Sequence, residues 1–148
     1  MYKSQYKSNI VPNDLSIQDK AYLAGILDGE GNISLLKNRS RNPRVRVQIA
    51  NTDYRLIDWL ISKTGVGNIN TRPGTEKHKT AYTWICNNEL AILILQQIRD
   101  YLVIKQDRCD LAIKASNLLN EFQDREDFSF NMEYTYNQMK MLNKKGPI

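Results

Sequence analysis

The residues with the clearest chemical potential lie in one segment, Leu23 to Gly31, which reads LAGILDGEG. Ala24, Gly25 and Gly29 are small residues about one helical turn apart, so two such helices could pack closely around a two-fold axis. Glu30 would then lie beside its symmetry mate, and two carboxylates would converge on one spot. Mg²⁺ prefers carboxylates together with water and phosphate oxygens, and paired metal ions can activate a water molecule for hydrolysis. The segment therefore indicates a metal-dependent hydrolytic site between two copies of the chain.

A simpler interpretation is that Asp28 and Glu30 end a solvent-exposed helix, with the glycines as its C-terminal cap. An acidic residue at a helix C-terminus opposes the helix dipole unless a cation is bound nearby. This small electrostatic penalty favours the metal interpretation.

The elements that must position these residues follow from hydrophobic periodicity and turn signals. Ser16 and Asp19 have capping-box spacing, which predicts a helix that ends at the glycines 29–31. A strand through Lys37 and a second strand after Asn42-Pro43 form a predicted hairpin with one apolar face. A helix capped by Thr52 or Asp53 ends at Gly65. A second hairpin over about 68–72 and 81–86 follows, and the chain is predicted to be helical from Asn88 onward.

This order predicts an α+β fold with an αββαββ core, additional C-terminal helices and an antiparallel sheet. Helices would cover one face of the sheet and leave the other open, as a saddle for a partner. We expect a flexible N-terminal arm over residues 1–15 and a single domain over 16–148. Within the domain we expect a core of about 16–120 and a helical extension of about 121–148.

The segment LAGILDGEG resembles the motif of the LAGLIDADG homing endonucleases, matching its leucine, alanine, glycine, aspartate and final glycine. Gly29 stands where the family name has alanine, and Glu30 stands where it has aspartate, which retains the carboxylate. The family's αββαββ order, its Gly-x-Gly after the second helix and its lysine just past the third helix also have counterparts. The resemblance covers roughly residues 16–120 and is far more specific than a lone glycine pattern.

The resemblance implies a single-motif, homodimeric, site-specific endonuclease that cuts double-stranded DNA, as in intron homing. Mg²⁺ would be the cofactor, with Mn²⁺ or Ca²⁺ able to substitute in binding, and the near-palindromic site would receive a staggered break with 3′ overhangs. The implied metal site is Glu30 with Gly29. Lys105 matches the active-site lysine, and Asn51 or Gln48 matches a polar position that holds water. The implied dimer interface comprises Leu23, Ala24, Gly25, Leu27 and Asp28, where Asp28 orients the helix end without binding metal.

The candidate DNA-facing residues follow from the strand pattern and the charge distribution. No acidic residue occurs from Gly31 to Thr52, a window that contains five basic residues. Side chains that alternate with the apolar face would project from the open sheet, and a β-ribbon fits the major groove of B-DNA. These are Ser34, Leu36, Asn38, Arg44, Arg46, Gln48, Asn68, Asn70, Arg72 and Thr83. The loop residues Arg39, Arg41, Lys77 and Lys79 are expected to contact phosphates. For any one of these residues, an ordinary solvated sheet face is the competing interpretation.

Composition agrees with a globular protein that binds an anion. The 148 residues are 41% hydrophobic and 25% charged, with a net charge of +5 and a pI near 9.2. Cys86, Cys109 and the single histidine, His78, lack the spacing of a zinc site, and reduced thiols are expected. His78 is expected to be a loop residue, and Tyr82 and Trp84 core aromatics. We expect a soluble, intracellular protein without a membrane partner.

Two other classes of function remain open at the level of sequence. One is a non-cleaving nucleic-acid-binding protein on the same scaffold, such as an RNA maturase, which would keep the basic sheet. RNA binding could also be a secondary activity of the endonuclease. The other is a structural α+β protein with a basic surface, which predicts no dimer through the helix that contains Ala24 and Gly25.

Overall fold

The computed structural model describes residues 10–37, 43–121 and 126–144. Helix α1 (Ile17–Glu30) begins where the Ser16 hydroxyl accepts a hydrogen bond from the Asp19 amide at 3.1 Å. It includes Gly29 and Glu30, so it ends within the predicted glycine segment, one residue beyond the first glycine. At Gly31, an added Cβ would lie 2.9 Å from the Cα of Leu27. Glycine is therefore required where the helix turns directly into the first strand.

Two hairpins, each preceded by a helix, build one sheet. Strands β1 (Gly31–Leu36) and β2 (Arg44–Asn51) form the first hairpin, and β3 (Asn68–Arg72) and β4 (Ala81–Asn87) form the second. Helix α2 (Tyr54–Thr64) lies between them in sequence, capped by the Asp53 carboxylate and ended by Gly65 in the left-handed conformation. The predicted αββαββ order is confirmed.

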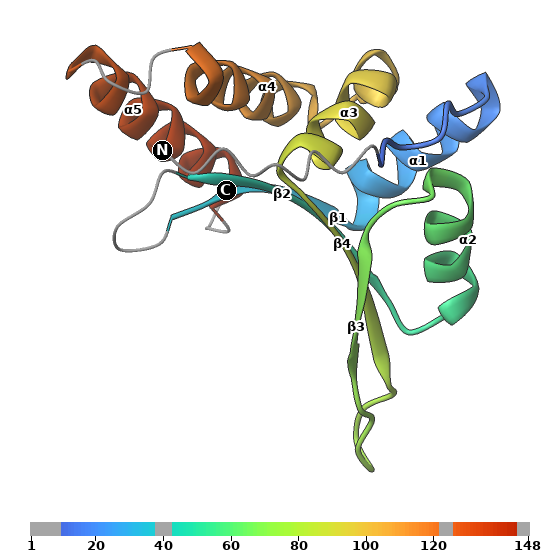
Figure 1. Ribbon diagram of the computed structural model, residues 1–148. Helices are drawn as coiled ribbons and strands as arrows, with labels where there is room; N and C mark the ends of the chain where they lie inside the picture. The colour runs from blue at the N-terminus through green and yellow to red at the C-terminus, as the bar shows by residue number, and fades with distance from the viewer. Residues whose placement is uncertain (1–9, 38–42, 122–125, 145–148) are drawn as a thin grey trace.

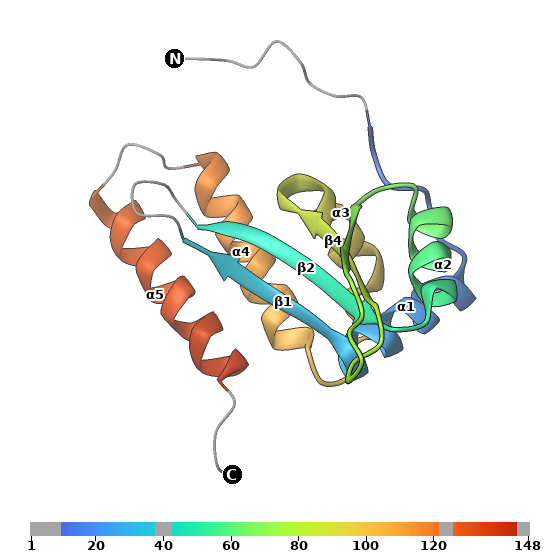
Figure 2. The ribbon, with the colours of Figure 1, turned by 90° about the horizontal axis from the view of Figure 1, so that it is seen from below.

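The four strands pair antiparallel in the order β1-β2-β4-β3. The register places Ile33 opposite Val47, and Val47 opposite Cys86, so buried side chains from three strands share one face. Figure 1 shows the helices on that side of a strongly curved sheet, while the other side is uncovered, and Figure 2 views the uncovered side. The predicted α+β class with an open sheet face is confirmed.

Trp84 anchors the centre of the core. Its side chain is fully buried, and its indole N–H donates to the carbonyl of Val66 at 2.9 Å. Gly67, at φ +102°, passes directly over the indole ring, where any side chain would collide. Tyr82 on the same strand is half-buried and packs edge-to-face on Tyr54, with ring centroids 5.0 Å apart. Both aromatic residues are packing residues, as expected.

The C-terminal half consists of α3 (Asn88–Ile98), a 3-10 turn η1 (Arg99–Tyr101), α4 (Gln106–Glu121) and α5 (Glu126–Asn143). The region predicted to be helical from Asn88 onward is interrupted after Ile98 by η1 and by Leu102, which is buried and has an extended backbone. Helix α5 packs on α4 and on β1.

The chain before α1 is attached to the domain. The Asn13 amide donates to the carbonyl of Thr64 at 2.9 Å, and the Leu15 amide donates to the side chain of Gln97 at 2.9 Å. Gln97 in turn donates to the carbonyl of Asn13. The arm predicted over residues 1–15 is thus hydrogen-bonded at Asn13 and Leu15, and its first nine residues lie outside the described part of the chain.

Both cysteines, Cys86 and Cys109, are free thiols in the hydrophobic core. Burial raises the pKa of Cys86 to about 11 and that of Cys109 to about 12, which keeps both protonated and unreactive. Within the described residues, no helix combines the length and apolar character needed to cross a bilayer.

Candidate active site and nucleic-acid interface

Glu30 is the exposed last residue of α1, at the point where the helix meets β1. One of its carboxylate oxygens accepts a hydrogen bond from the Asn51 side-chain amide at 2.8 Å. The oxygen of that amide accepts the backbone N–H of Asp53 at 2.8 Å, which fixes the NH₂ group toward Glu30. Asn51 therefore orients the Glu30 carboxylate from the last position of β2.

Asp28 has a different environment from Glu30. Its carboxylate accepts backbone N–H groups from Val103 at 2.8 Å, Ile104 at 3.2 Å and Lys105 at 3.0 Å. These three bonds hold the loop between η1 and α4 against the end of α1. Asp28 is thus a positioning residue, because its carboxylate already has three donors.

Lys105 completes this connection from the other side. Its ammonium donates to the carbonyls of Leu27 at 2.9 Å and Asp28 at 2.6 Å, two of the last carbonyls of α1. A cation at this position favours the negative end of the helix dipole. Burial lowers the pKa of Lys105 below its ordinary value, and the nearby positive charge of Arg108 lowers it further, while Asp28 opposes both. The lysine predicted from its position past the third helix thus lies at the end of the motif helix.

The donor set around Glu30 suits a hard cation. The Glu30 carboxylate and the Gly29 carbonyl, one of the helix-end carbonyls that α1 itself cannot satisfy, are both oxygen ligands. Among the described residues, no group of three or more His, Cys, Asp or Glu side chains could hold a metal ion. One carboxylate and one carbonyl are fewer ligands than Mg²⁺ or Ca²⁺ takes.

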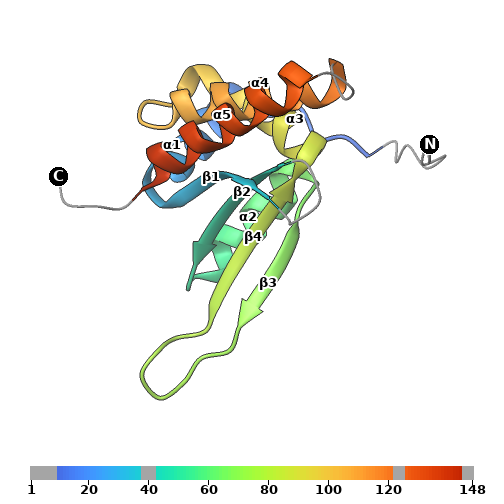
Figure 3. The same ribbon diagram turned by 90° about the vertical axis from the view of Figure 1, so that its left-hand side faces the viewer.

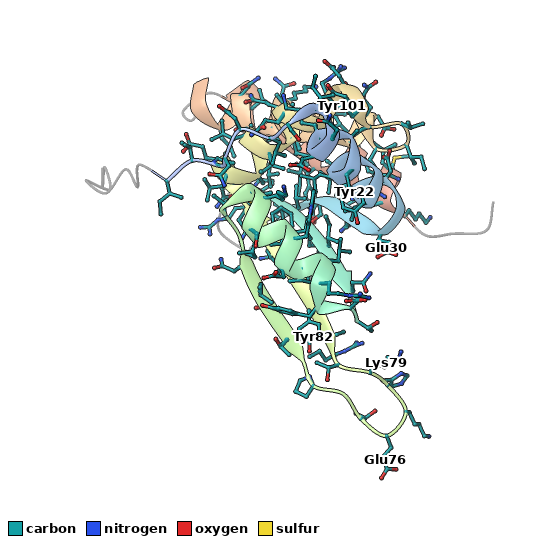
Figure 4. The ribbon with its side chains drawn as sticks, turned by 90° about the vertical axis from the view of Figure 1, so that its right-hand side faces the viewer. Tyr22, Glu30, Glu76, Lys79, Tyr82 and Tyr101 are labelled. Carbon is teal, nitrogen blue, oxygen red and sulfur yellow. The ribbon has the colours of Figure 1, made fainter. Side chains whose placement is uncertain are left out.

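The exposed flank of α1 differs from the predicted interface. Leu23, Ala24 and Leu27 are at most 1% exposed and belong to the core of the chain, so within one chain they are not on the surface; their assignment to a dimer interface stays a prediction. Leu23 and Leu27 lie about one helical turn apart, with Ala24 next to Leu23, on the side that packs on α3 and the sheet. By contrast, Gly25 and Gly29 are exposed, and an added Cβ at either would meet nothing within 4 Å. Tyr22 shares the exposed flank with Glu30 (Figure 4).

The open face of the sheet carries the predicted DNA-facing residues. In β1 and β2, Ser34 lies opposite Arg46, and Leu36 lies opposite Arg44. In β3 and β4, Asn70 lies opposite Thr83. Directly paired residues of antiparallel strands share a face, and Asn68 and Arg72 are on the same face as Asn70 by alternation. Gln48 belongs here too, opposite Asn32, and therefore on the face opposite to Asn51.

The hairpin loop that carries Lys77 and Lys79 extends far from the helices (Figures 3 and 4). Both lysines are exposed, and the Thr75 hydroxyl accepts the N–H groups of Lys77 and His78, which orders the turn. His78 is an exposed loop residue, as expected. Asn38, Arg39 and Arg41 lie outside the described residues.

Sequence reasoning missed several residues of the open face, namely Asn32, Ile85 and Asn87. Asn87 accepts a hydrogen bond from the Arg46 guanidinium at 3.0 Å and therefore orients that arginine. Ile85 lies between Gln48 and Asn68 in the register. Ile85 and Asn87 follow Thr83 at two-residue intervals on β4, so strand alternation could have predicted both. Ile85 was missed because an apolar residue is not expected on a polar face.

No protein-family model and no curated protein matches this sequence. Solved structures do match. The homing endonuclease I-CvuI, in complex with its target in the presence of Ca²⁺, aligns with a TM-score of 0.72 at 17% identity, over 88% of this chain and 87% of that one. The archaeal intron-encoded homing endonuclease I-Vdi141I, complexed with DNA, aligns with a TM-score of 0.73 at 16% identity, over 88% and 87%.

The LAGLIDADG meganuclease I-CpaMI, bound to uncleaved DNA, aligns with a TM-score of 0.61 at 17% identity. The alignment covers 87% of this chain but only 51% of I-CpaMI. The present chain thus corresponds to nearly all of the shorter proteins and to about half of the longer one, and it contains one copy of the motif. It has the LAGLIDADG homing endonuclease fold in its single-motif form.

Proposed function

We propose that this protein is a site-specific endodeoxyribonuclease that acts as a homodimer on a near-palindromic duplex. The observation that carries the proposal is the position of Glu30: an exposed carboxylate, oriented by Asn51, at the end of a helix with an open glycine flank. The reaction would be hydrolysis of one phosphodiester in each strand, leaving a staggered break with 3′ overhangs. I-CvuI and I-Vdi141I, which share the fold, are homing endonucleases bound to DNA.

Dimerisation would occur through the exposed flank of α1. Gly25 and Gly29 leave room for a second helix backbone to approach, and Tyr22 can pack at the edge of that contact. A two-fold axis along this flank would bring the two Glu30 carboxylates together. Asp28 would act inside each subunit, since its carboxylate is used on the 103–105 loop.

The proposed metal ligands are the Glu30 carboxylate and the Gly29 carbonyl from each subunit, with phosphate oxygens and water completing the shell. Bound Mg²⁺ would supply an activated water nucleophile and neutralise charge on the leaving oxygen. Mn²⁺ or Ca²⁺ would support binding, because both accept the same oxygen ligands. I-CvuI has been crystallised with DNA in the presence of Ca²⁺ and of Mg²⁺.

Lys105 and Asn51 would act beside Glu30. The Lys105 ammonium, held at the end of α1, can stabilise the charge that develops on the scissile phosphate. Asn51 would keep the Glu30 carboxylate in one orientation. Gln48, on the open face near the start of β1, can hold water or a base edge at the floor of the site.

The open sheet face would read the major groove. Arg44 and Arg46 can recognise guanine through two hydrogen bonds each, and the asparagines of β3 can recognise adenine. The proposed surface is completed by Ser34, Leu36, Asn38, Gln48, Arg72 and Thr83. Arg39, Arg41, Lys77 and Lys79 would contact phosphates and set the register on the duplex.

The test is selection of cleaved sites from a randomised duplex library with Mg²⁺, with a parallel sample in EDTA. We expect one near-palindromic sequence to be cut in both strands with 3′ overhangs, and no cleavage in EDTA. Sequence-selective retention of duplexes without cleavage would contradict the nuclease assignment and favour a binding protein. Preferential retention of a structured RNA over every duplex would favour a maturase.

A further inference from the structure

Helix α5 and the end of β1 form a cationic cluster outside the surfaces described so far. The Lys37 ammonium lies 5.6 Å from the centroid of the Tyr136 ring, and the Lys140 ammonium lies 5.7 Å from the same centroid. Lys37 follows the last residue of β1, whereas Tyr136 and Lys140 are one turn apart on α5. We refer to Lys37, Tyr136 and Lys140 as the lysine–tyrosine cluster.

The cluster is fixed to the sheet. Met132 and Met139 of α5 are buried in the common core, and α5 packs along β1. The Asn143 side-chain amide donates to the β1 carbonyl of Ile33 at 2.7 Å. This contact ties the end of α5 to the edge strand, so the cluster has a defined position relative to the open face.

The lysines of the cluster are available to an external anion. Lys37 and Lys140 are exposed, as is Lys144, four residues further along. Of the described carboxylates, none lies within 4.0 Å of these ammonium groups, and Glu133 is the acidic residue nearest in sequence on α5. Two exposed ammonium groups at one aromatic ring concentrate positive charge on this part of the surface. An external phosphate can neutralise it.

The position of the lysine–tyrosine cluster beside the open sheet face indicates DNA as its partner. Seen from the open face, α5 lies beside the β1 edge rather than behind the sheet (Figure 2). A duplex long enough to run across β1 and β2 would therefore pass the cluster on leaving the sheet. Lysine ammonium groups are mobile point charges that meet phosphate oxygens without reading base edges, so contact with the DNA backbone is the interaction that fits.

We infer that the lysine–tyrosine cluster is a phosphate-binding site for the DNA backbone at the flank of the recognition site. It extends the footprint beyond the sheet and gives α5 a role in binding. The inference rests on the proposed function, since it requires DNA on the open face. Tyr136 acts as a positioning residue, because its ring contacts both ammonium groups.

The test uses the salt dependence of equilibrium binding, which counts neutralised phosphates. A random-sequence duplex suffices as probe, because phosphate contacts do not depend on base sequence. The control is Lys114→Gln: Lys114 also lies over a tyrosine of α5, 5.8 Å from the Tyr134 ring centroid, but it lines the α4–α5 groove with Leu111 and Gln138. The two variants therefore remove the same charge from the same kind of ring contact.

We expect Lys140→Gln to reduce the slope of log K against log salt by about 0.9 for each bound subunit. Lys37→Gln together with Lys140→Gln should reduce it further, and Lys114→Gln should leave it at the wild-type value. Identical slopes for Lys140→Gln and Lys114→Gln, with normal wild-type binding, would overturn the inference alone. A wild-type chain that binds no duplex at low salt would instead overturn the proposed function, and the inference with it.

Discussion

At the scale of single residues, the two acidic side chains of the motif have separate roles. The Asp28 carboxylate accepts three consecutive backbone N–H groups from another segment, whereas Glu30 accepts one hydrogen bond and remains exposed. Spacing alone cannot distinguish them, because both follow small residues near a helix end. The distinction arises from the loop over residues 103–105, which folds against Asp28 from a distant part of the sequence.

Asp28→Asn should lower stability by weakening this loop contact. The asparagine amide offers one acceptor oxygen and carries no charge. A hydrogen bond to a charged acceptor contributes about 1.5–3 kcal/mol to the stability of the folded state. We expect a loss of about 1–2 kcal/mol in urea unfolding. Asp107→Asn is the control, since Asp107 is an exposed acidic residue that accepts one local N–H, from Arg108. Equal stability of the two variants would contradict a positioning role for Asp28.

The free protein should show a depressed pKa for Lys105. Burial and Arg108 both disfavour its charged form. The folded state then binds this proton more weakly than the unfolded state, so this residue's contribution to stability rises with pH between the lowered pKa and the ordinary value. NMR titration of the lysine Cε signals should give Lys105 a midpoint below the ordinary lysine value. Bound duplex should raise the Lys105 midpoint, because phosphates favour the ammonium form.

A Lys105 midpoint at the ordinary lysine value would mean that the ammonium is not held between α1 and α4. If added duplex does not change the Lys105 signal, a position of this lysine beside the scissile phosphate would be contradicted. Lys105→Arg retains the charge and serves to identify the signal by its loss.

At the scale of elements, α1 has two sides with different surroundings. Leu23, Ala24 and Leu27 face the core, and Gly25 and Gly29 face open space. Gly25→Leu should therefore leave the monomer folded, because its Cβ meets nothing, but should block close approach of a second α1 helix. We expect sedimentation equilibrium to show a monomer and DNA cleavage to be lost. Gln96→Leu, which adds leucine to the exposed side of α3, should remain dimeric and active.

A Gly25→Leu variant that remains dimeric would place the interface elsewhere. A Gly25→Leu variant that fails to fold would contradict the open space at this position. Circular dichroism of the same samples distinguishes these two outcomes.

The sequence predicted the elements where local chemistry is decisive. Ser16 and Asp53 cap α1 and α2, Gly65 ends α2 in the left-handed conformation, and strand alternation predicts the shared face of Ser34, Arg46 and Thr83. The motif itself could not show which side of α1 faces the core, because small residues such as Ala24 suit both a tight core and a tight interface. That choice is made by packing on α3 and the sheet.

Long-range contacts explain the other differences between expectation and structure. Asn51 and Gln48 are the two sequence candidates for the polar position beside Glu30. They are three residues apart on β2, so their side chains lie on opposite faces of the sheet. Of the two, Asn51 is hydrogen-bonded to Glu30. Helix α3 ends at Ile98, and Leu102 beyond it is buried with an extended backbone. The docking of α5 on β1 depends on residues about 110 positions apart, with the Asn143–Ile33 contact as its clearest sign.

At the scale of the whole molecule, one chain presents half of the proposed assembly. It presents a curved open sheet, an exposed Glu30 at one end of that sheet, and a helix flank with room for a copy of itself. Two-fold assembly would join two sheets into one saddle and pair the carboxylates. The proposed target is therefore two half-sites in inverted repeat.

Footprinting should show this symmetry. A duplex that carries both selected half-sites should be bound by two chains, and one that carries a single half-site should bind at least about 100-fold more weakly, since the second subunit loses its base contacts. Equal affinity for both duplexes would contradict a dimer whose two sheets engage DNA together.

The most direct test of the central claim is single-turnover cleavage of the selected duplex by wild type and by Glu30→Gln. The amide removes the charge of the metal ligand and keeps the side-chain shape. We predict that cleavage with Mg²⁺ falls at least about 100-fold, while duplex affinity measured with Ca²⁺ stays within a few-fold of wild type. Cleavage by Glu30→Gln at the wild-type rate would contradict the account, because Glu30 would then not hold the metal that cuts the DNA.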